Sequence, residues 1–573
     1  MAPKAFTAEL HAGVLELWLD TPNSDVNVFT EAAAVELLAI LKELDFEQVR
    51  ALVLRSRKRG SFVNGVGLLM ASAARRPDDV TRLSAPVRRA FRALRALPIP
   101  TVCAIQGNCY GCGVELSLHT SQRVADRAFD THFYMTELAE YLFLPVFGAT
   151  QDLPALLGLE SAVDFLMWGQ RWTADEACRR GLIDACFAPE EFETELARFV
   201  EAVLTGTQRG APAPRVPDPG ALRAIDQRIA ALPPDYRDLY AECFLLMQRA
   251  LEGSDYAAEL AASARSVLEP RSKAALSLFF VKQVAKSTAL RNVTFEPVQH
   301  VAVCGDADLA QALRSRRIRK LVVSESSTQP ANEADLTLFP YAQQPPVAAG
   351  AVAIARHDDI ESSPRWTSST IAYFPLPDGE FVEIAAREPT PERARAYDLF
   401  TRAGFDAIVS RPTAGFVSDA LIGAYLAPLR RFLAHAGKPE DAGRTLRNFG
   451  FVKLPSELLR ARRDALELPC SPGAEASSGQ SVPALRGAVV ISLLDCALES
   501  LGDGSLPHVS QLDVLARAVL DFPLLHASLG RYLNLHNVAA ALREIEANGR
   551  DLVPERVLKR AEEYLRESRP FYR

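Results

Sequence analysis

Hydrophobic and polar positions change their period several times within the first hundred residues. Val14–Asp20 (VLELWLD) alternates apolar and polar residues, which predicts a half-buried strand. Thr30–Leu44 (TEAAAVELLAILKEL) has apolar residues at helical spacing, whereas Val49–Ser56 (VRALVLRS) and Ile99–Gly107 (IPTVCAIQG) are continuous apolar runs of strand length. This order of strand, helix and strand predicts an α/β domain.

The rest of the chain is mostly helical in pattern and contains a second strand–turn–helix unit. Helical spacing covers residues 161–199, with one break at 181–184, and returns up to about Leu290. Between them, Gly210–Gly220 (GAPAPRVPDPG) is dense in proline and glycine and predicts a linker. Gln299–Leu313 (QHVAVCGDADLAQAL) has the pattern of a buried strand, a turn and a helix, which opens a second α/β unit.

After Pro391 we expect an almost entirely helical chain. The polar stretch Leu468–Pro483 divides it into two halves of similar length, which could be an internal duplication. A chain of 573 residues is too long for a single core, so three or four domains are expected.

Composition narrows the class of protein. The apolar share of 48% and the charged share of 24% are ordinary for a globular protein, and a net charge of −7 argues against nucleic acid and anionic membranes. Nine scattered cysteines do not resemble a secreted disulfide framework. The N-terminus lacks the apolar core of a signal peptide, and no run is long enough to span a bilayer. We therefore expect a cytoplasmic protein without an integral membrane segment.

The segment Gly107–Leu116 (GNCYGCGVEL) is the first candidate site. A glycine-rich turn that starts a helix exposes backbone N–H groups, which can hold a phosphate or stabilise an oxyanion. Glu115 lies one turn into that helix, where it could act as an acid or base, or simply suit a helix N-terminus. A metal or redox role for Cys109 and Cys112 would need a second pair of ligands, and the neighbouring sequence contains none.

Several motifs in the first 200 residues resemble the crotonase (enoyl-CoA hydratase/isomerase) family. Ala104–Asp126 is similar to the family signature, in which a Gly-Gly-Gly-x-Glu loop follows a strand. The resemblance continues upstream in Gly13–Leu38 and Leu52–Leu69, and downstream in Leu144–Phe187, which ends in the family's "A…GLVD" pattern. The motifs occur in the family's order.

Later segments resemble the α-subunits of bacterial fatty acid oxidation complexes. Ala274–Thr288 looks like their linker helix, and the terminal residues 562–573 look like their tail. Phe405–Phe451 and Phe522–Leu542 are similar to the helical domain of 3-hydroxyacyl-CoA dehydrogenases and its repeat.

The resemblance implies an α/β multidomain chain with four parts. These are a crotonase-like (ClpP/crotonase) domain at 1–205, a linker and helical segment at 206–297, a degenerate Rossmann-like NAD-binding domain at 298–390, and an all-α, 3-hydroxyacyl-CoA dehydrogenase-like domain of two repeats at 391–573.

In this family, two backbone N–H groups bind the thioester oxygen of an acyl-CoA, and two glutamates handle the water and the proton. By motif, Glu115 matches the first glutamate, and the N–H groups of Val66 and Cys112 match the oxyanion donors. Cys112 replaces a glycine, so its Cβ requires an ordinary φ and takes space beside the substrate. The family's Gly-Ala-Asp is Gly65-Val66-Gly67 here, without the aspartate.

The second glutamate is assigned by context. The family places it seven residues before Pro145, which gives Leu138 when counted without a gap. Glu137 requires one inserted residue, but its Met-Thr-Glu context resembles the family's Leu-Pro-Glu, so we expect Glu137, with Glu140 as the alternative. A surface carboxylate in a loop remains the other interpretation of Glu137.

Coenzyme A would contact the basic run after the strand at 49–56. Arg57, Lys58, Arg59 and Gly65 are the expected contacts, although the three basic residues could equally be a solvated surface.

The dehydrogenase motifs are eroded. A dinucleotide site needs G-x-G-x-x-G, and only Gly305 remains, since Ala307 and Ala310 replace the other glycines. Asp306 and Asp308 add negative charge where the phosphates would lie. The family's catalytic histidine should fall in Ile371–Pro375, which contains none. We therefore expect NAD binding to be lost.

The leading hypothesis is reversible hydration of 2-enoyl-CoA thioesters, with Glu115 as the base, Glu137 as the acid and no cofactor beyond coenzyme A in the substrate. Double-bond isomerisation, or dehydration in a biosynthetic pathway, is a close alternative. A different alternative is a catalytically impaired scaffold subunit of a fatty acid oxidation-like complex, which would bind a thiolase-like β-subunit. A homo-oligomer is also possible.

Overall fold

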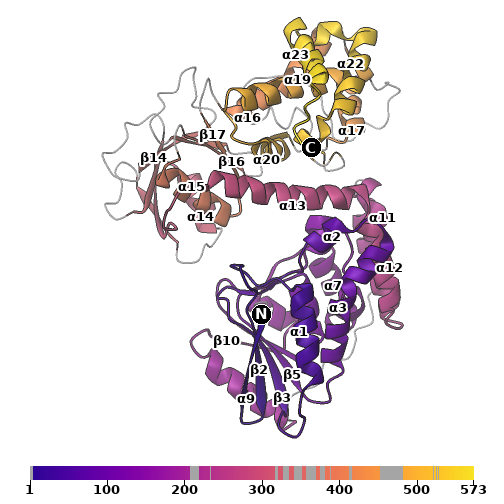
Figure 1. Cartoon of the computed structure of the whole chain (residues 1–573), viewed down its shortest axis with the longest axis vertical. Coiled ribbons are helices and arrows are strands. Elements are labelled where there is room, and N and C mark those ends of the chain that lie inside the picture. The colour runs from indigo at the N-terminus through magenta and orange to yellow at the C-terminus, as the bar shows by residue number, and fades with distance from the viewer. Residues whose placement is uncertain are drawn as a thin grey trace. The chain divides into compact units, whose positions relative to one another are not determined.

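The structure, a computed structural model, consists of two compact units, Met1–Leu276 and Ser277–Arg573 (Figure 1). It describes residues 4–206, 219–232, 234–315, 321–326, 334–340, 351–356, 370–374, 381–386, 389–411, 416–435, 437–451, 482–520, 522–523, 526 and 528–572. The predicted linker falls largely outside these residues, and the polar stretch between the two helical halves falls almost wholly outside them.

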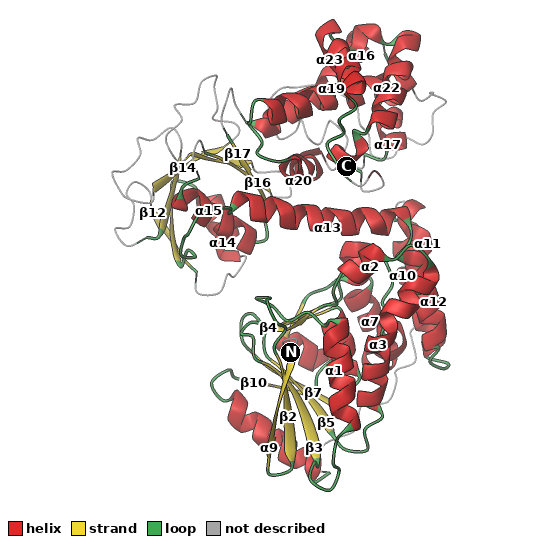
Figure 2. Cartoon of the chain, in the orientation of Figure 1, coloured by secondary structure: helices red, strands yellow, loops and turns green. Residues whose placement is uncertain are grey.

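A six-stranded sheet forms the base of the first unit (Figure 2). Its strands, in spatial order, are β1 (Phe6–His11), β2 (Val14–Leu19), β3 (Ala51–Ser56), β5 (Thr101–Ile105), β7 (Gln122–Asp126) and β10 (Ala185–Phe187). Only the pairing of β1 with β2 is antiparallel. The continuous apolar runs of β3 and β5 are buried on both faces, as parallel strands usually are.

Helices cover this sheet. One face of β3, β5 and β7 packs against Phe192, Leu196 and Phe199 of α9 (Phe192–Leu204). The other helices of the first unit are α1 (Glu31–Lys42), α2 (Leu69–Ala73), α3 (Pro77–Arg95), α4 (Cys112–Leu118), α5 (Glu137–Tyr141), α6 (Ala149–Leu157), α7 (Leu159–Leu166), α8 (Ala174–Arg180), α10 (Pro219–Ala230), α11 (Pro234–Ala250) and α12 (Tyr256–Ser266), followed by α13 (Pro270–Ala289), which begins in this unit.

A second, four-stranded sheet positions the candidate site. Its order is β4 (Ser61–Asn64), β6 (Asn108–Tyr110), β8 (His132–Tyr134) and β9 (Trp172–Thr173). The pairs β4–β6 and β6–β8 are parallel, with Asn64 opposite Tyr110 and Tyr110 opposite Tyr134. The carboxyl ends of these three neighbouring strands therefore lie at one edge of the sheet.

The second unit contains a seven-stranded sheet and a helical bundle. The spatial order of the strands is β12 (Val322–Ser326), β11 (His300–Cys304), β13 (Leu336–Pro340), β14 (Ala351–Arg356), β15 (Thr370–Phe374), β16 (Phe381–Ala385) and β17 (Asp406–Ser410). The described helices are α14 (Ala307–Ser315), α15 (Pro391–Arg402), α16 (Val417–Ala434), α17 (Pro439–Phe449), α19 (Pro483–Gly502), α20 (Val509–Leu520), α21 (Leu529–Tyr532), α22 (Leu535–Asn548) and α23 (Glu555–Glu567), with a 3₁₀ turn η3 (Arg550–Leu552). The largely buried α19 is the centre of the bundle and packs against α16 and α22.

One expectation from sequence is wrong and another is incomplete. Residues 161–199 are expected from the sequence to be helical with a single break. They are interrupted more often, because they also contain the short strands β9 and β10. The chain after Pro391 includes β17, which extends the second sheet beside β16. Each of these three strands is five residues or shorter, too short for its periodicity to stand out between helices. No helix in the described part of the chain is long and apolar enough to cross a membrane.

Candidate active site

Three loops that follow β4, β6 and β8 bring the predicted site residues together. Val66 follows β4, Cys112 follows β6, and Glu137 follows β8. The Gly111 N–H donates to the Tyr134 carbonyl at 2.8 Å, which ties the second loop to the third. Since the three strands are parallel neighbours, the two predicted oxyanion donors and the second glutamate lie at one edge of the sheet.

The glycine loop accommodates Cys112. The positive φ falls at Gly111, which has φ 49°, whereas Cys112 starts α4 and is absent from the residues with positive φ. A Cβ at residue 111 would overlap the Glu137 carboxylate, and one at residue 113 would overlap the Val63 carbonyl. Glycine is therefore required at 111 and 113 and not at 112, so the cysteine side chain does not by itself distort the loop.

The two predicted oxyanion donors are free to bind a substrate. In the described residues, neither the Val66 N–H nor the Cys112 N–H donates to a protein acceptor. Cys112 is the first residue of α4, where an amide has no partner within the helix and the dipole favours negative charge. The Val66 segment is held by Phe29, whose N–H donates to the Gly65 carbonyl at 2.9 Å.

Glu137 is buried and Glu140 is exposed. Glu137 is 7% exposed, and its carboxylate lies against the Cα of Gly111. Its Oε2 atom is buried and has no hydrogen-bond partner among the described residues. Glu140 instead pairs with Arg171 at 3.7 Å at the surface, and Leu138 is a buried apolar residue. A buried carboxylate oxygen without a partner is costly and indicates that a ligand or water completes its hydrogen bonding.

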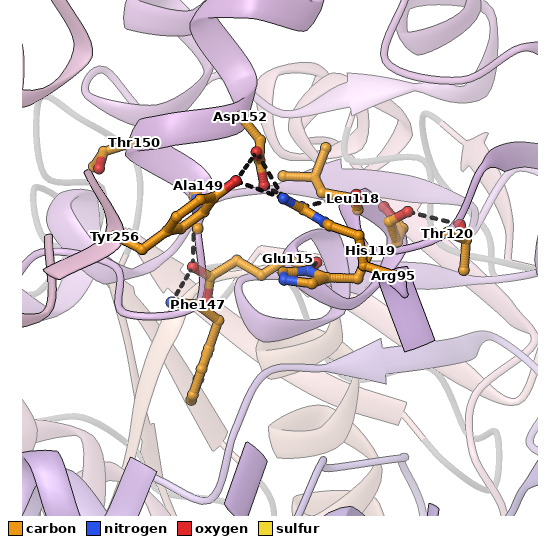
Figure 3. Close-up of polar contacts among 12 residues, drawn as sticks. Arg95, Glu115, Leu118, His119, Thr120, Phe147, Ala149, Thr150, Asp152 and Tyr256 are labelled. Atoms are coloured by element: carbon orange, nitrogen blue, oxygen red, sulfur yellow. Dashed lines mark hydrogen bonds and ion pairs between the residues drawn. The ribbon is translucent and has the colours of Figure 1, made fainter. Parts of the chain in front are cut away.

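Glu115 projects from α4 toward the start of α6. Its Oε1 atom accepts hydrogen bonds from the Phe147 N–H at 2.8 Å and the Ala149 N–H at 3.3 Å (Figure 3). The side chain is 1% exposed. The amides at the beginning of a helix stabilise the ionised form of a carboxylate, so Glu115 is oriented by backbone rather than by flexible side chains.

The acidity of both glutamates is shifted. Burial raises the pKa of Glu137 to about 7, against hydrogen bonds from its own backbone and that of Thr136. Burial, followed by the charges of Glu137 and Glu259, raises the pKa of Glu115, and the two backbone donors oppose this rise. Carboxyl groups with raised pKa values that face one another can hold one proton and one charge near neutral pH.

A polar network behind Glu115 was not predicted from the sequence. Arg95 of α3 forms an ion pair with Asp152 of α6 (Figure 3). It also donates hydrogen bonds to the Tyr256 hydroxyl of α12 at 2.5 Å and to the Leu118 carbonyl at 3.1 Å. The Tyr256 hydroxyl donates to Asp152 at 2.7 Å. Arg95 thus joins the end of α4 to the starts of α6 and α12, and no local motif marks these residues.

The expected coenzyme A contacts are not equivalent. Lys58 is committed to internal partners, since Nζ lies 2.7 Å from Asp20 and donates to the Ser24 carbonyl at 2.6 Å. Arg57 pairs with Glu9 and stacks on the Trp18 ring at 4.0 Å. Arg59 is exposed and forms no ion pair with a described residue, and Gly65 has φ 90° with open space beside its Cα.

The cysteines of the glycine loop are buried free thiols. Burial raises the pKa of Cys109 and of Cys112 well above the usual value, so neither is a reactive thiolate. Within the ranges that the structure describes, no group of three or more histidine, cysteine or acidic side chains could hold a metal ion.

The turn after β11 carries a carboxylate at the start of α14. Gly305 has φ 66°, and the buried Asp306 side chain accepts the Leu309 N–H at 3.0 Å, which caps α14. This end of a helix binds phosphate when its amides are free. Here a carboxylate occupies one of these donors and adds negative charge at the helix end.

The first unit has the crotonase fold. Residues 9–209 match the family model for enoyl-CoA hydratase/isomerase, so this part of the chain is an enoyl-CoA hydratase/isomerase domain.

Relatives of known identity match the same region. The fatty acid oxidation complex subunit alpha of Shewanella amazonensis is 34% identical over 201 residues, which are 35% of this chain and 28% of that protein. The same subunit of Shewanella loihica is 33% identical over 207 residues, which are 36% of this chain and 29% of that protein. The same subunit of Vibrio vulnificus is 33% identical over 201 residues, which are 35% of this chain and 28% of that protein. The matched segment therefore spans less than a third of each relative's length.

Solved structures are similar over the same half of the chain. The enoyl-CoA hydratase of Bacillus halodurans is 18% identical with a TM-score of 0.36, covering 48% of this chain and 99% of that structure. Pseudomonas aeruginosa DspI is 24% identical with a TM-score of 0.33, covering 43% of this chain and 82% of that structure. The family assignment rests on the sequence match.

Proposed function

We propose that the first unit catalyses reversible hydration of 2-enoyl-CoA thioesters. The observation that carries the proposal is the unpartnered Oε2 of Glu137, which is buried at the same sheet edge as two free backbone N–H groups. An acid or base must contact its proton acceptor or donor directly, and a buried oxygen without a protein partner is available for that contact.

In the proposed reaction, the thioester oxygen accepts hydrogen bonds from the Val66 and Cys112 N–H groups. These donors stabilise the enolate that forms in the transition state, and each is worth about 3–4 kcal/mol. Glu115, whose ionised form is supported by two backbone amides, takes a proton from water as its oxygen bonds to the β carbon. Glu137, whose Oε2 has no donor, gives its proton to the α carbon.

The test is incubation with crotonyl-CoA and longer 2-enoyl-CoAs, following loss of the conjugated thioester absorbance and identifying the product. We expect a 3-hydroxyacyl-CoA, and Glu115→Gln should abolish its formation. A shifted double bond without addition of water would indicate an isomerase instead. No turnover at any chain length would contradict catalysis and favour the scaffold alternative.

For coenzyme A, we propose Arg59 and Gly65 as the contacts, because Arg57 and Lys58 already have partners. Arg59→Ala should raise KM with little change in kcat, since it removes binding that is equal in the ground and transition states.

We also propose that the second unit combines a Rossmann-like domain that has lost NAD binding with a 3-hydroxyacyl-CoA dehydrogenase-like helical domain. The Asp306 cap and the alanines at 307 and 310 support this. Calorimetric titration with NADH should show no heat of binding, and micromolar affinity would overturn the proposal.

The relatives are subunits of a complex by name, and we propose that this chain also assembles with a thiolase-like subunit. Purification of the tagged chain from native lysate should recover such a subunit. A monodisperse monomer would contradict assembly.

A further inference from the structure

Glu259 is a buried carboxylate on α12, outside the region that matches the enoyl-CoA hydratase/isomerase family. It is 1% exposed and lies at the start of α6, the same helix end that holds Glu115. Its Oε1 accepts the Gly148 N–H at 2.7 Å, and its Oε2 accepts the Thr150 N–H at 2.9 Å and the Thr150 hydroxyl at 2.5 Å.

The two carboxylates divide the amides of one helix end between them. Glu115 takes the N–H groups of Phe147 and Ala149, and Glu259 takes those of Gly148 and Thr150. Glu259 has a third donor in the Thr150 hydroxyl, so its ionised form is the better supported of the two.

We propose that Glu259 is a positioning residue of the active site, which holds the start of α6 in place and sets a second carboxylate at the helix end that orients Glu115. The proposal rests on the proposed function for its catalytic meaning, but the electrostatic coupling can be measured without turnover. A nearby negative charge disfavours ionisation of Glu115, so Glu115 takes a proton from water more readily than it would alone.

Other titratable groups surround Glu115 and Glu259. Glu115 faces Glu137 from α5 and Cys112 on its own helix, while its backbone carbonyl contacts His119 Nδ1 at 2.8 Å. Burial raises the pKa of Cys112 and lowers that of His119 to about 4, so both are neutral at pH 7.

Around Glu259, Asp152 of α6 adds a negative charge that Arg95 of α3 neutralises, and Tyr256 donates to Asp152. Cys243 of α11 is buried, and burial raises its pKa, so it is neutral. Burial raises the pKa of Glu259 itself to about 7, against its three donors.

Helix α12 also supports the loop before α6 by contacts that carry no charge. Ser263 of α12 donates to the Leu144 carbonyl at 2.8 Å, and the Leu144 N–H donates to Ser266 at 3.0 Å. Ser263→Ala therefore provides a control that weakens attachment of the loop without removing a charge.

The experiment is an NMR titration of the whole chain with ¹³C-labelled glutamate carboxyls, in which Glu115→Gln identifies the Glu115 signal. In Glu259→Gln, the midpoint of Glu115 should fall by at least about 0.5 pH unit, whereas Ser263→Ala should leave it in place. In turnover, the acidic limb of the kcat/KM profile should move by the same amount. An unchanged midpoint in folded Glu259→Gln would overturn the proposal.

If Glu259→Gln does not fold, Thr150→Ala serves instead. It removes one donor from Glu259, makes that carboxylate harder to ionise, and should lower the Glu115 midpoint in the same direction. A shifted midpoint in a chain that hydrates no enoyl-CoA would leave the coupling intact and refute only the proposed function.

Discussion

The carboxylate of Glu137 lies directly against the Cα of Gly111, so a side chain at residue 111 would occupy the place of one carboxylate oxygen. Gly111 also has φ 49°, a conformation that favours glycine. The glycine loop, which contains the proposed oxyanion donor Cys112, and the Glu137 side chain are therefore fitted to each other.

Gly111→Ala should greatly reduce hydration, because it both strains the loop and displaces Glu137. A displacement near 1 Å can lower kcat by about a hundredfold. Cys112→Gly is the matched control on the next residue and should retain most of the activity, since position 112 has an ordinary φ. Equal loss in both variants, measured by steady-state kinetics, would contradict the close fit at residue 111.

Glu137 should make stability depend on pH. Its pKa is about 7 in the folded chain against an ordinary value of 4.5, so between these values the unfolded chain releases a proton that the folded chain keeps. Stability therefore falls as pH rises through this window, by about 3 kcal/mol in all. Glu137→Gln should unfold at the same temperature as the parent at pH 4 and at a higher temperature at pH 8. If Glu137→Gln were no more stable than the parent at pH 8, burial would not disfavour the charged form of the Glu137 carboxyl.

Arg95 should stabilise the first unit because it contacts three other helices, α4, α6 and α12. Arg95→Gln breaks the pair with Asp152 and the contacts with Tyr256 and the end of α4, and should lower the free energy of unfolding by about 1–2 kcal/mol. The exposed Arg92 lies one turn earlier on α3, and Arg92→Gln should have little effect. Denaturant unfolding compares them, and equal effects would contradict a specific role for Arg95.

In the second unit, Glu383 of β16 should stabilise the fold without affecting hydration. This fully buried carboxylate accepts the Ser410 hydroxyl at 2.6 Å and the N–H groups of Val417 and Ser418 at 2.9 Å. Glu383→Ala leaves these donors unsatisfied and should destabilise this unit by about 3 kcal/mol, and Glu383→Gln by less because it keeps an acceptor. Crotonyl-CoA turnover at low temperature should not change. Loss of turnover in both variants would place Glu383 in a role that its contacts do not explain.

The residues of the candidate site could be predicted where a local motif places them after a strand. Val66, Cys112 and Glu115 belong to such motifs, and the sheet brings their loops to one edge. For the second glutamate an insertion removes the fixed spacing, so the sequence favours Glu137 only by its Met-Thr-Glu context. The structure adds that the Glu137 carboxylate is buried and that of Glu140 is exposed, which the sequence does not show.

The supporting residues could not be predicted in the same way. Glu259 lies more than a hundred residues from its partners at the start of α6, in an alanine-rich helix without a motif. The sequence predicts Lys58 as a contact for coenzyme A, but the fold gives it internal partners at Asp20 and Ser24. The expected strain at Cys112 is not present, because the helix begins one residue after the glycine that takes the positive φ.

The most direct measurement compares Glu137→Gln with Glu140→Gln in the hydration of crotonyl-CoA. The two glutamates are three residues apart, but only Glu137 is buried with an unpartnered oxygen. We predict that Glu137→Gln lowers kcat/KM by about a hundredfold or more, as expected for loss of a general acid, while Glu140→Gln stays within about twofold of the parent. Full activity in Glu137→Gln, or an equal loss in both variants, would contradict the proposed active site.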